Sequence, residues 1–233
     1  MRLDGDENED QNEDNNKNNN NNNECIYIPL GPNWHATKNL IKLGFRDFCY
    51  PFDWLLTNAD SGIEYVTNNI NNNFKDFTKN LAYNKYKQVY SINYPDTIFF
   101  HHNLFKNLIN GKPAKYNLLK KYGQGAQKFM KMIKNENNEI IFLYSYPLYY
   151  YNNQKHFDIF YKTLVDFENN TKIKAKFKLI IYVTQNDKDF EFIKYDEINK
   201  LKYTQFHKYI RDTKSSKYDG NKNDFLELLK NIE

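Results

Sequence analysis

Four side chains in the first half of the chain are of types that can transfer protons or attack a carbon atom. Asp53 carries a carboxylate, and the adjacent His101 and His102 carry imidazoles, which titrate near neutral pH. Cys49 carries a thiol, which becomes a nucleophile when it ionises. A histidine that is oriented by a carboxylate can act as a base and activate a thiol or a water molecule. These residues suit an active hydrolase in two versions, with Asp53 and a histidine activating water or with Cys49 as the nucleophile.

Each of these residues also has a structural interpretation. Cys49 stands between Phe48 and Tyr50, where a free cysteine is more often a small buried hydrophobe than a nucleophile. His101 and His102 point to opposite faces if they continue a strand, so at most one of them faces a pocket. Two histidines without nearby carboxylates or thiolates do not make a metal site, and we expect no metal and no cofactor.

The segment 29–54 departs from the composition of the chain, which is otherwise rich in Lys, Asn, Ile and Tyr. It holds three of the six Pro and both Trp residues. Gly31 allows a sharp turn, and free N–H groups at the start of a following helix can bind an anion or an oxyanion. Arg46 offers a planar fork of donors, with Asp53 as a candidate partner. We expect Gly31, Asn33 and Arg46 to bind a ligand; the alternative is an Arg46–Asp53 pair that only stabilises the fold, with both Trp residues packed in the core.

Three blocks of sequence in this region match a known pattern. They are Leu-Gly-Pro-Asn-Trp at 30–34, Leu-Gly-Phe-Arg at 43–46 and Tyr-Pro-Phe-Asp-Trp-Leu-Leu at 50–56. This opening resembles that of a family described as papain-like cysteine peptidases. In that family a Gly-x-x-Cys turn precedes a helix ending in Leu-Gly-Leu-Arg and a Tyr-Pro-Phe-Asp-Trp block. The likeness continues more loosely through 99–103 and 121–129.

The resemblance assigns roles to several residues and also exposes a departure. It implies that His101 or His102 is the base and that Asp53 orients it. The family's nucleophilic Cys is replaced by Trp34, whose indole can neither form a thiolate nor attack a carbonyl carbon. Asn103 stands where the family often has an acid. The resemblance therefore implies a divergent, catalytically impaired member that retains a pocket for a small molecule or peptide.

A non-enzymatic polyanion-binding protein is the remaining alternative. The net charge is +4, but residues 1–23 hold seven acidic and two basic residues, so the rest of the chain carries about nine more basic than acidic groups. A basic surface attracts phosphate. However, the chain has only three Arg, and its Lys residues are scattered rather than clustered, so we do not expect nucleic acid as a partner.

Cysteine content and hydropathy bear on location. Cys25 and Cys49 allow one disulfide at most, and the chain has neither an apolar signal sequence nor a run of 18 apolar residues. We therefore expect a cytoplasmic protein in a reducing compartment, with no membrane association.

The periodicity of apolar residues places these candidates on a mixed set of elements. Residues 1–23 are acidic and Asn-rich and predict a disordered tail, followed by a single domain over 24–233. Strands are predicted at 26–30, 88–92, 97–101, 139–144 and 177–184, with a further edge strand at 190–193. Helices are predicted at 34–43, ending at Gly44, and at 60–77, 116–134, 156–167 and 224–232.

The strands at 139–144 and 177–184 are continuously apolar, which is typical of a parallel sheet covered on both faces. We therefore predict a doubly wound, three-layer α/β domain with a mostly parallel sheet. Ligands in such folds bind beyond the carboxyl ends of the strands. This rule puts the following residues at one edge: Gly31 to Trp34, His101, His102, Ser145, Tyr146, Thr184 and Gln185.

Overall fold

A computed structural model describes residues 25–46, 48–86, 88–99, 115–185, 195–210 and 222–232. The tail predicted at 1–23, the edge strand predicted at 190–193, and both His101 and His102 lie outside these residues. None of the helices in the described part of the chain is long and apolar enough to span a membrane.

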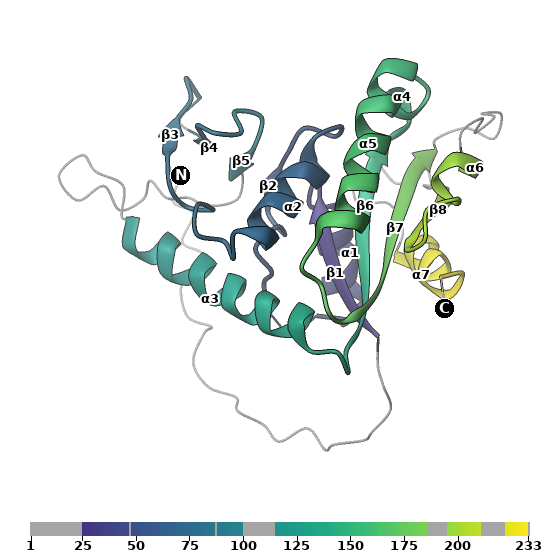
Figure 1. Cartoon of the computed structure of the whole chain (residues 1–233), viewed down its shortest axis with the longest axis horizontal. Coiled ribbons are helices and arrows are strands. Elements are labelled where there is room, and N and C mark those ends of the chain that lie inside the picture. Colours follow the sequence, from purple (N-terminus) through teal and green to yellow (C-terminus); the bar gives the residue numbers. More distant parts are fainter. Residues whose placement is uncertain are drawn as a thin grey trace, which may run out of the picture.

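The centre of the molecule is a parallel four-stranded sheet. Its strands are β1 (Ile26–Gly31), β6 (Glu139–Pro147), β7 (Lys176–Gln185) and β8 (Thr204–Ile210), in the order β1-β6-β7-β8 (Figure 1). The apolar runs of β6 and β7 pair directly, with Phe142 opposite Leu179. These findings confirm a mixed α/β fold with a parallel sheet.

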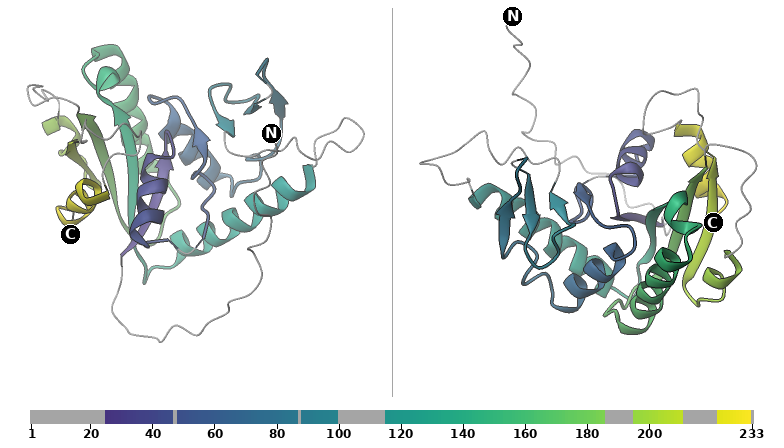
Figure 2. Two further views of the ribbon diagram at one scale, coloured as in Figure 1. Left: turned by 180° about the vertical axis from the view of Figure 1, so that it is seen from behind. Right: turned by 90° about the horizontal axis from the view of Figure 1, so that it is seen from above.

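Helices pack on both faces of this sheet, because alternate strand residues point to opposite sides. On one face lie α1 (His35–Leu43) and α7 (Lys222–Lys230); on the other lie α2 (Gly62–Asn71) and α5 (Gln154–Asn170) (Figure 2). Buried strand residues follow the same alternation: Tyr27, Ile141, Leu143, Ile180 and Tyr182 pack with α1 and α7, and Ile28, Phe142, Tyr144, Leu179 and Ile181 pack with the other helices.

A second, smaller sheet stands beside the first. It contains β2 (Leu55–Leu56), β5 (Ile98–Phe99), β4 (Val89–Ser91) and β3 (Leu81–Tyr83), all antiparallel. The strands predicted at 88–92 and 97–101 are thus present as β4 and β5, but they pair antiparallel and lie outside the parallel sheet. The long helix α3 (Lys115–Lys134) links the two sheets: Tyr122 packs on Phe99 of the small sheet, and Phe129 packs on Phe142 of the large one.

Most predicted boundaries lie within a few residues of those observed, with one exception. The helix α1 ends at Gly44, whose φ of 77° is readily adopted by glycine, as predicted. The helix predicted over 60–77 is wrong beyond Asn71, because Asn73 and Phe74 have positive φ angles. Phe74 still reaches the core, where it packs against Phe52.

The strand β8 was not predicted, since it lies at the sheet edge and mixes polar and apolar residues. Two short helices, α4 (Leu148–Tyr151) and α6 (Tyr195–Ile198), complete the described part.

Candidate functional site

The turn after β1 lies at the carboxyl edge of the parallel sheet. Trp34 precedes α1 and is half-buried. The side-chain oxygen of Asn33 accepts a hydrogen bond from the His35 backbone N–H at 2.9 Å, so Asn33 supports the helix start. The Thr57 backbone N–H donates to the Pro32 carbonyl at 2.8 Å, which ties the chain before α2 to the same turn.

Arg46 and Asp53 form a buried ion pair, as the sequence suggested. The side chains of Arg46 and Asp53 are 2% and 0% exposed. The Asp53 carboxylate also accepts the Tyr50 backbone N–H at 2.5 Å and faces the Thr37 hydroxyl, while Arg46 donates to the Phe48 carbonyl. Burial raises the pKa of Asp53 to about 6, although Arg46 and the Tyr50 N–H act to lower it. With both its oxygens engaged and no exposure, this carboxylate holds the chain segment together.

Cys49 differs from its expected environment. Its side chain was expected to be buried and is exposed, because the loop that carries it runs over α3 rather than into the core. The Cys49 carbonyl lies so near Gly125 of α3 that a Cβ there would come within 3.1 Å of it. The two histidines proposed to act with Cys49 or Asp53, His101 and His102, lie outside the described residues.

A different carboxylate meets a histidine on the other side of the fold. Asp60, which is 5% exposed, accepts a hydrogen bond from the Tyr146 hydroxyl at 2.8 Å through one oxygen and contacts Nδ1 of His156 through the other. The His156 side chain is 32% exposed, and its ring packs edge-on against Tyr150, with 4.6 Å between centroids. Burial and the nearby Asp60 raise the pKa of Tyr146, so its hydroxyl keeps its proton and donates a hydrogen bond to Asp60.

Three elements position this cluster. Asp60 lies in the turn before α2, where Asn58 accepts its backbone N–H at 2.8 Å. Tyr146 lies near the carboxyl end of β6 and stacks on Phe160 of α5 with ring centroids 4.0 Å apart. His156 belongs to the first turn of α5. Gly62 lets α2 start this close to the sheet, because a Cβ there would lie 2.4 Å from the Tyr144 hydroxyl.

The sequence did not predict that Asp60, Tyr146 and His156 lie together. Asp60 and His156 each match the start of a helix, and 96 positions separate them. Only Tyr146 was placed correctly, at the carboxyl edge. Contact between Asp60 and His156 depends on α2 and α5 packing side by side on one face of the sheet, which local sequence patterns do not reveal.

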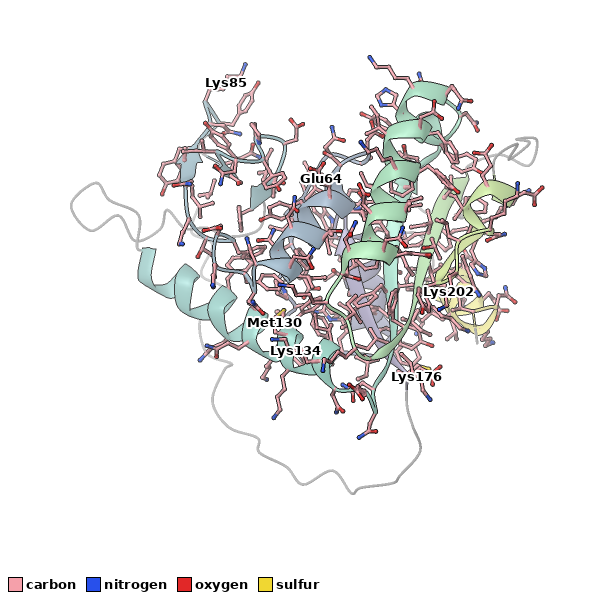
Figure 3. The ribbon with its side chains drawn as sticks, viewed as in Figure 1. Glu64, Lys85, Met130, Lys134, Lys176 and Lys202 are labelled. Carbon is pink, nitrogen blue, oxygen red and sulfur yellow. The ribbon has the colours of Figure 1, made fainter. Side chains whose placement is uncertain are left out.

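A small pocket opens on the other side of the turn that carries Asp60. It has a volume of about 140 Å³ and lies between the start of α2 and the β4–β5 turn. Two acidic residues, Glu64 and Asp96, and two aromatic ones, Tyr65 and Tyr94, line it, and none of the described residues that line it is basic. Figure 3 places Glu64 on α2, between the small sheet and α5.

Within the described ranges, no three His, Cys, Asp or Glu side chains come together in a way that could hold a metal ion. Comparisons with protein-family models, with curated proteins and with solved structures give no match to this chain.

Proposed function

We propose that this chain binds a small molecule or peptide, and that it is a divergent relative of the papain-like cysteine peptidases without their thiol chemistry. Trp34 carries this proposal, because it stands at the family's cysteine position and at the start of α1. Asp53, the carboxylate that the resemblance assigns to catalysis, already has Arg46 as its partner. Both observations favour binding over thiol catalysis in this segment.

The pocket between α2 and the β4–β5 turn is the proposed binding site. Two ordered contacts support its shape: Asn68 donates to the Tyr94 hydroxyl at 2.5 Å, and the rings of Tyr65 and Tyr94 meet edge-on at 4.9 Å. Glu64 and Asp96 give it negative charge, and aromatic faces attract cations. We therefore propose a ligand that carries an amine or a guanidinium group.

A pocket that binds a cationic ligand is not suited to bind a polyanion. An acidic pocket repels phosphate, and the basic residues that would attract it are dispersed. Lys85 lies at the small sheet, away from Lys134, Lys176 and Lys202 (Figure 3).

The strand order of the parallel sheet supports the proposed place of the binding site. Helices on both faces of the sheet support the proposed three-layer arrangement. The strand order β1-β6-β7-β8 has no reversal, so it does not support double winding, and the described sheet lacks the switch point at which doubly wound sheets bind ligands. We therefore assign binding to the region beside the β1 edge, where Thr57 forms a backbone hydrogen bond with Pro32 and also lines the pocket.

Cys25 and Cys49 are unbridged, which supports the proposed cytoplasmic location.

Calorimetric titration of the full chain with N-acetyl-lysine methylamide tests the proposed ligand class. We expect binding that weakens about tenfold or more in Glu64→Gln and Asp96→Asn, because each change removes a charge from the pocket. Asp76→Asn, which removes an exposed carboxylate outside the pocket, is the matched control. Equal binding of the uncharged analogue N-acetyl-norleucine methylamide would contradict the proposal.

The proposed lack of thiol chemistry needs a separate assay. Neither Cys49→Ser nor alkylation with iodoacetamide should change any peptide hydrolysis by the purified protein. Loss of hydrolysis in Cys49→Ser would show that Cys49 has replaced the missing nucleophile, whereas loss after alkylation alone would leave Cys25 as the reacting thiol.

A further inference from the structure

We propose that His156 is a proton-transfer residue, positioned by Asp60, through which this chain hydrolyses esters with water rather than with a thiol. The inference goes beyond ligand binding, and it rests on the contacts of Asp60, Tyr146 and His156 rather than on the pocket.

The Asp60 carboxylate is held on both sides by other side chains. Asp60 is almost fully buried, and each of its side-chain oxygens has a partner: the Tyr146 hydroxyl on one and Nδ1 of His156 on the other. The Thr163 hydroxyl also lies 3.4 Å from the backbone carbonyl oxygen of Asp60, which helps to fix the main chain there. A carboxylate held in this way cannot turn toward solvent, so it fixes the direction of the imidazole ring.

The contact with Asp60 leaves the other ring nitrogen of His156 available for proton transfer. An ionised carboxylate only accepts hydrogen bonds, so whenever the His156 ring is neutral, contact between Nδ1 and Asp60 places the proton on Nδ1. The lone pair is then on Nε2, which has no hydrogen-bond partner among the described residues. About a third of the side chain is exposed, which gives water and a substrate access to the ring. This is the arrangement that general-base catalysis requires.

Aromatic side chains hold the His156 ring and Tyr146 in place. Tyr150 packs against the His156 ring, and Tyr146 is held by stacking on Phe160 with an angle of 10° between ring planes. Proton transfer is efficient when the base is already in place before the substrate arrives. The supporting side chains come from β6, α4 and α5, so the site does not depend on a single loop.

The reaction can be written without any further group. Nε2 of His156 takes a proton from water while the water oxygen bonds to the ester carbonyl carbon, and the carbonyl π electrons move onto oxygen. When the tetrahedral intermediate collapses, the bond to the alcohol oxygen breaks, and the imidazolium returns its proton to that oxygen. Ester and water become acid and alcohol, His156 is neutral again, and Asp60 stays ionised throughout.

The test measures hydrolysis of p-nitrophenyl acetate by the full chain at pH 7.5. We expect kcat/KM to exceed the rate constant of free imidazole and to fall about 100-fold in His156→Gln. His207→Gln is the matched control, because it removes a half-buried histidine on β8 and should leave the rate unchanged. Added imidazole should restore activity to His156→Ala.

Asp60 needs its own readout, because a buried carboxylate also stabilises the fold. In folded Asp60→Asn, we expect kcat to fall at least tenfold with KM unchanged, since the ring loses its orientation but the substrate contacts remain. A rise in KM alone would assign Asp60 to substrate binding and contradict a positioning role.

Three results would overturn the proposal: equal rates for His156→Gln and His207→Gln, no rescue of His156→Ala by imidazole, or an acetyl group accumulating on His156 during turnover. The last would show attack by the imidazole instead of water. None of these results depends on Glu64 or Asp96, so they leave the pocket test independent.

Discussion

Asp53 and Asp60 stand seven positions apart, and both are buried carboxylates, yet they form different structures. Asp53 pairs with Arg46, whose side chain is 2% exposed, while Asp60 pairs with His156, whose side chain is 32% exposed. An arginine stays protonated at any pH that a protein encounters, whereas a histidine gains and loses its proton near neutrality. The first pair can only hold the chain together; the second can also move a proton.

The more recognisable motif carries the carboxylate that is less able to react with a substrate. The Tyr-Pro-Phe-Asp-Trp block that carries Asp53 is the most recognisable part of the chain, and its carboxylate is fully engaged. Asp60 belongs to no such block. The identity and exposure of the partner separate the two roles.

The largest predicted effect concerns Arg46. Arg46→Leu leaves Asp53 buried without its partner and should lower the free energy of unfolding by about 3–5 kcal/mol. Urea denaturation measures this, with Lys79→Leu as the control because Lys79 forms an exposed pair with Asp76. A change as small as that of the control would mean that the Arg46–Asp53 pair does not hold the fold.

A smaller effect is expected at Gly62, which lets α2 begin beside Tyr144. In Gly62→Ala the new methyl group would meet the Tyr144 hydroxyl at 2.4 Å, and we expect a loss of about 1–3 kcal/mol. Gly123 of α3 has open space around it, so Gly123→Ala should be neutral or stabilising by up to about 1 kcal/mol. Thermal unfolding of both variants decides the matter, and equal melting temperatures would refute the close approach.

Tyr146→Phe removes one hydrogen bond to Asp60 and keeps the ring that stacks on Phe160. We expect a loss of about 1.5–3 kcal/mol, the range for a hydrogen bond to a charged group. Tyr161→Phe, on the partly buried surface of α5, is the control. Unchanged stability in Tyr146→Phe, measured by urea denaturation, would argue against a fixed Asp60 carboxylate.

The pH dependence of stability is the most gradual effect, because it is spread over about two pH units. The folded-state pKa of Asp53, about 6, lies above its ordinary value of 3.8, so between these values the folded protein binds more protons than the unfolded chain. The contribution of Asp53 to stability therefore falls as pH rises from about 4 to about 6, by at most about 1.4 kcal/mol per pH unit. Asp53→Asn should remove this slope, which urea denaturation at several pH values can detect; an unchanged slope would contradict the raised pKa.

The parallel sheet could be predicted from the sequence, but the cluster of Asp60, Tyr146 and His156 could not, and the reason for the difference is physical. Continuous apolar runs such as 140–143 reveal buried strands locally, and Gly44 marks the end of a helix by its backbone freedom. The Arg46–Asp53 pair was also accessible, because its members lie close in sequence. The second sheet, β8 and the Asp60–His156 contact depend on which helices and strands pack together over long separations. No local periodicity encodes that information.

The most direct test of the contrast between the two carboxylates is the protonation of the His156 ring, measured by long-range ¹⁵N–¹H NMR correlation at a pH where the ring is neutral. If Asp60 orients the ring as the structure indicates, the proton is on Nδ1 and Nε2 shows the shift of an unprotonated nitrogen. In Asp60→Asn this preference should disappear. A proton on Nε2 in the unmodified chain would contradict the central claim, because the ring would then present a donor, and not a base, to the solvent.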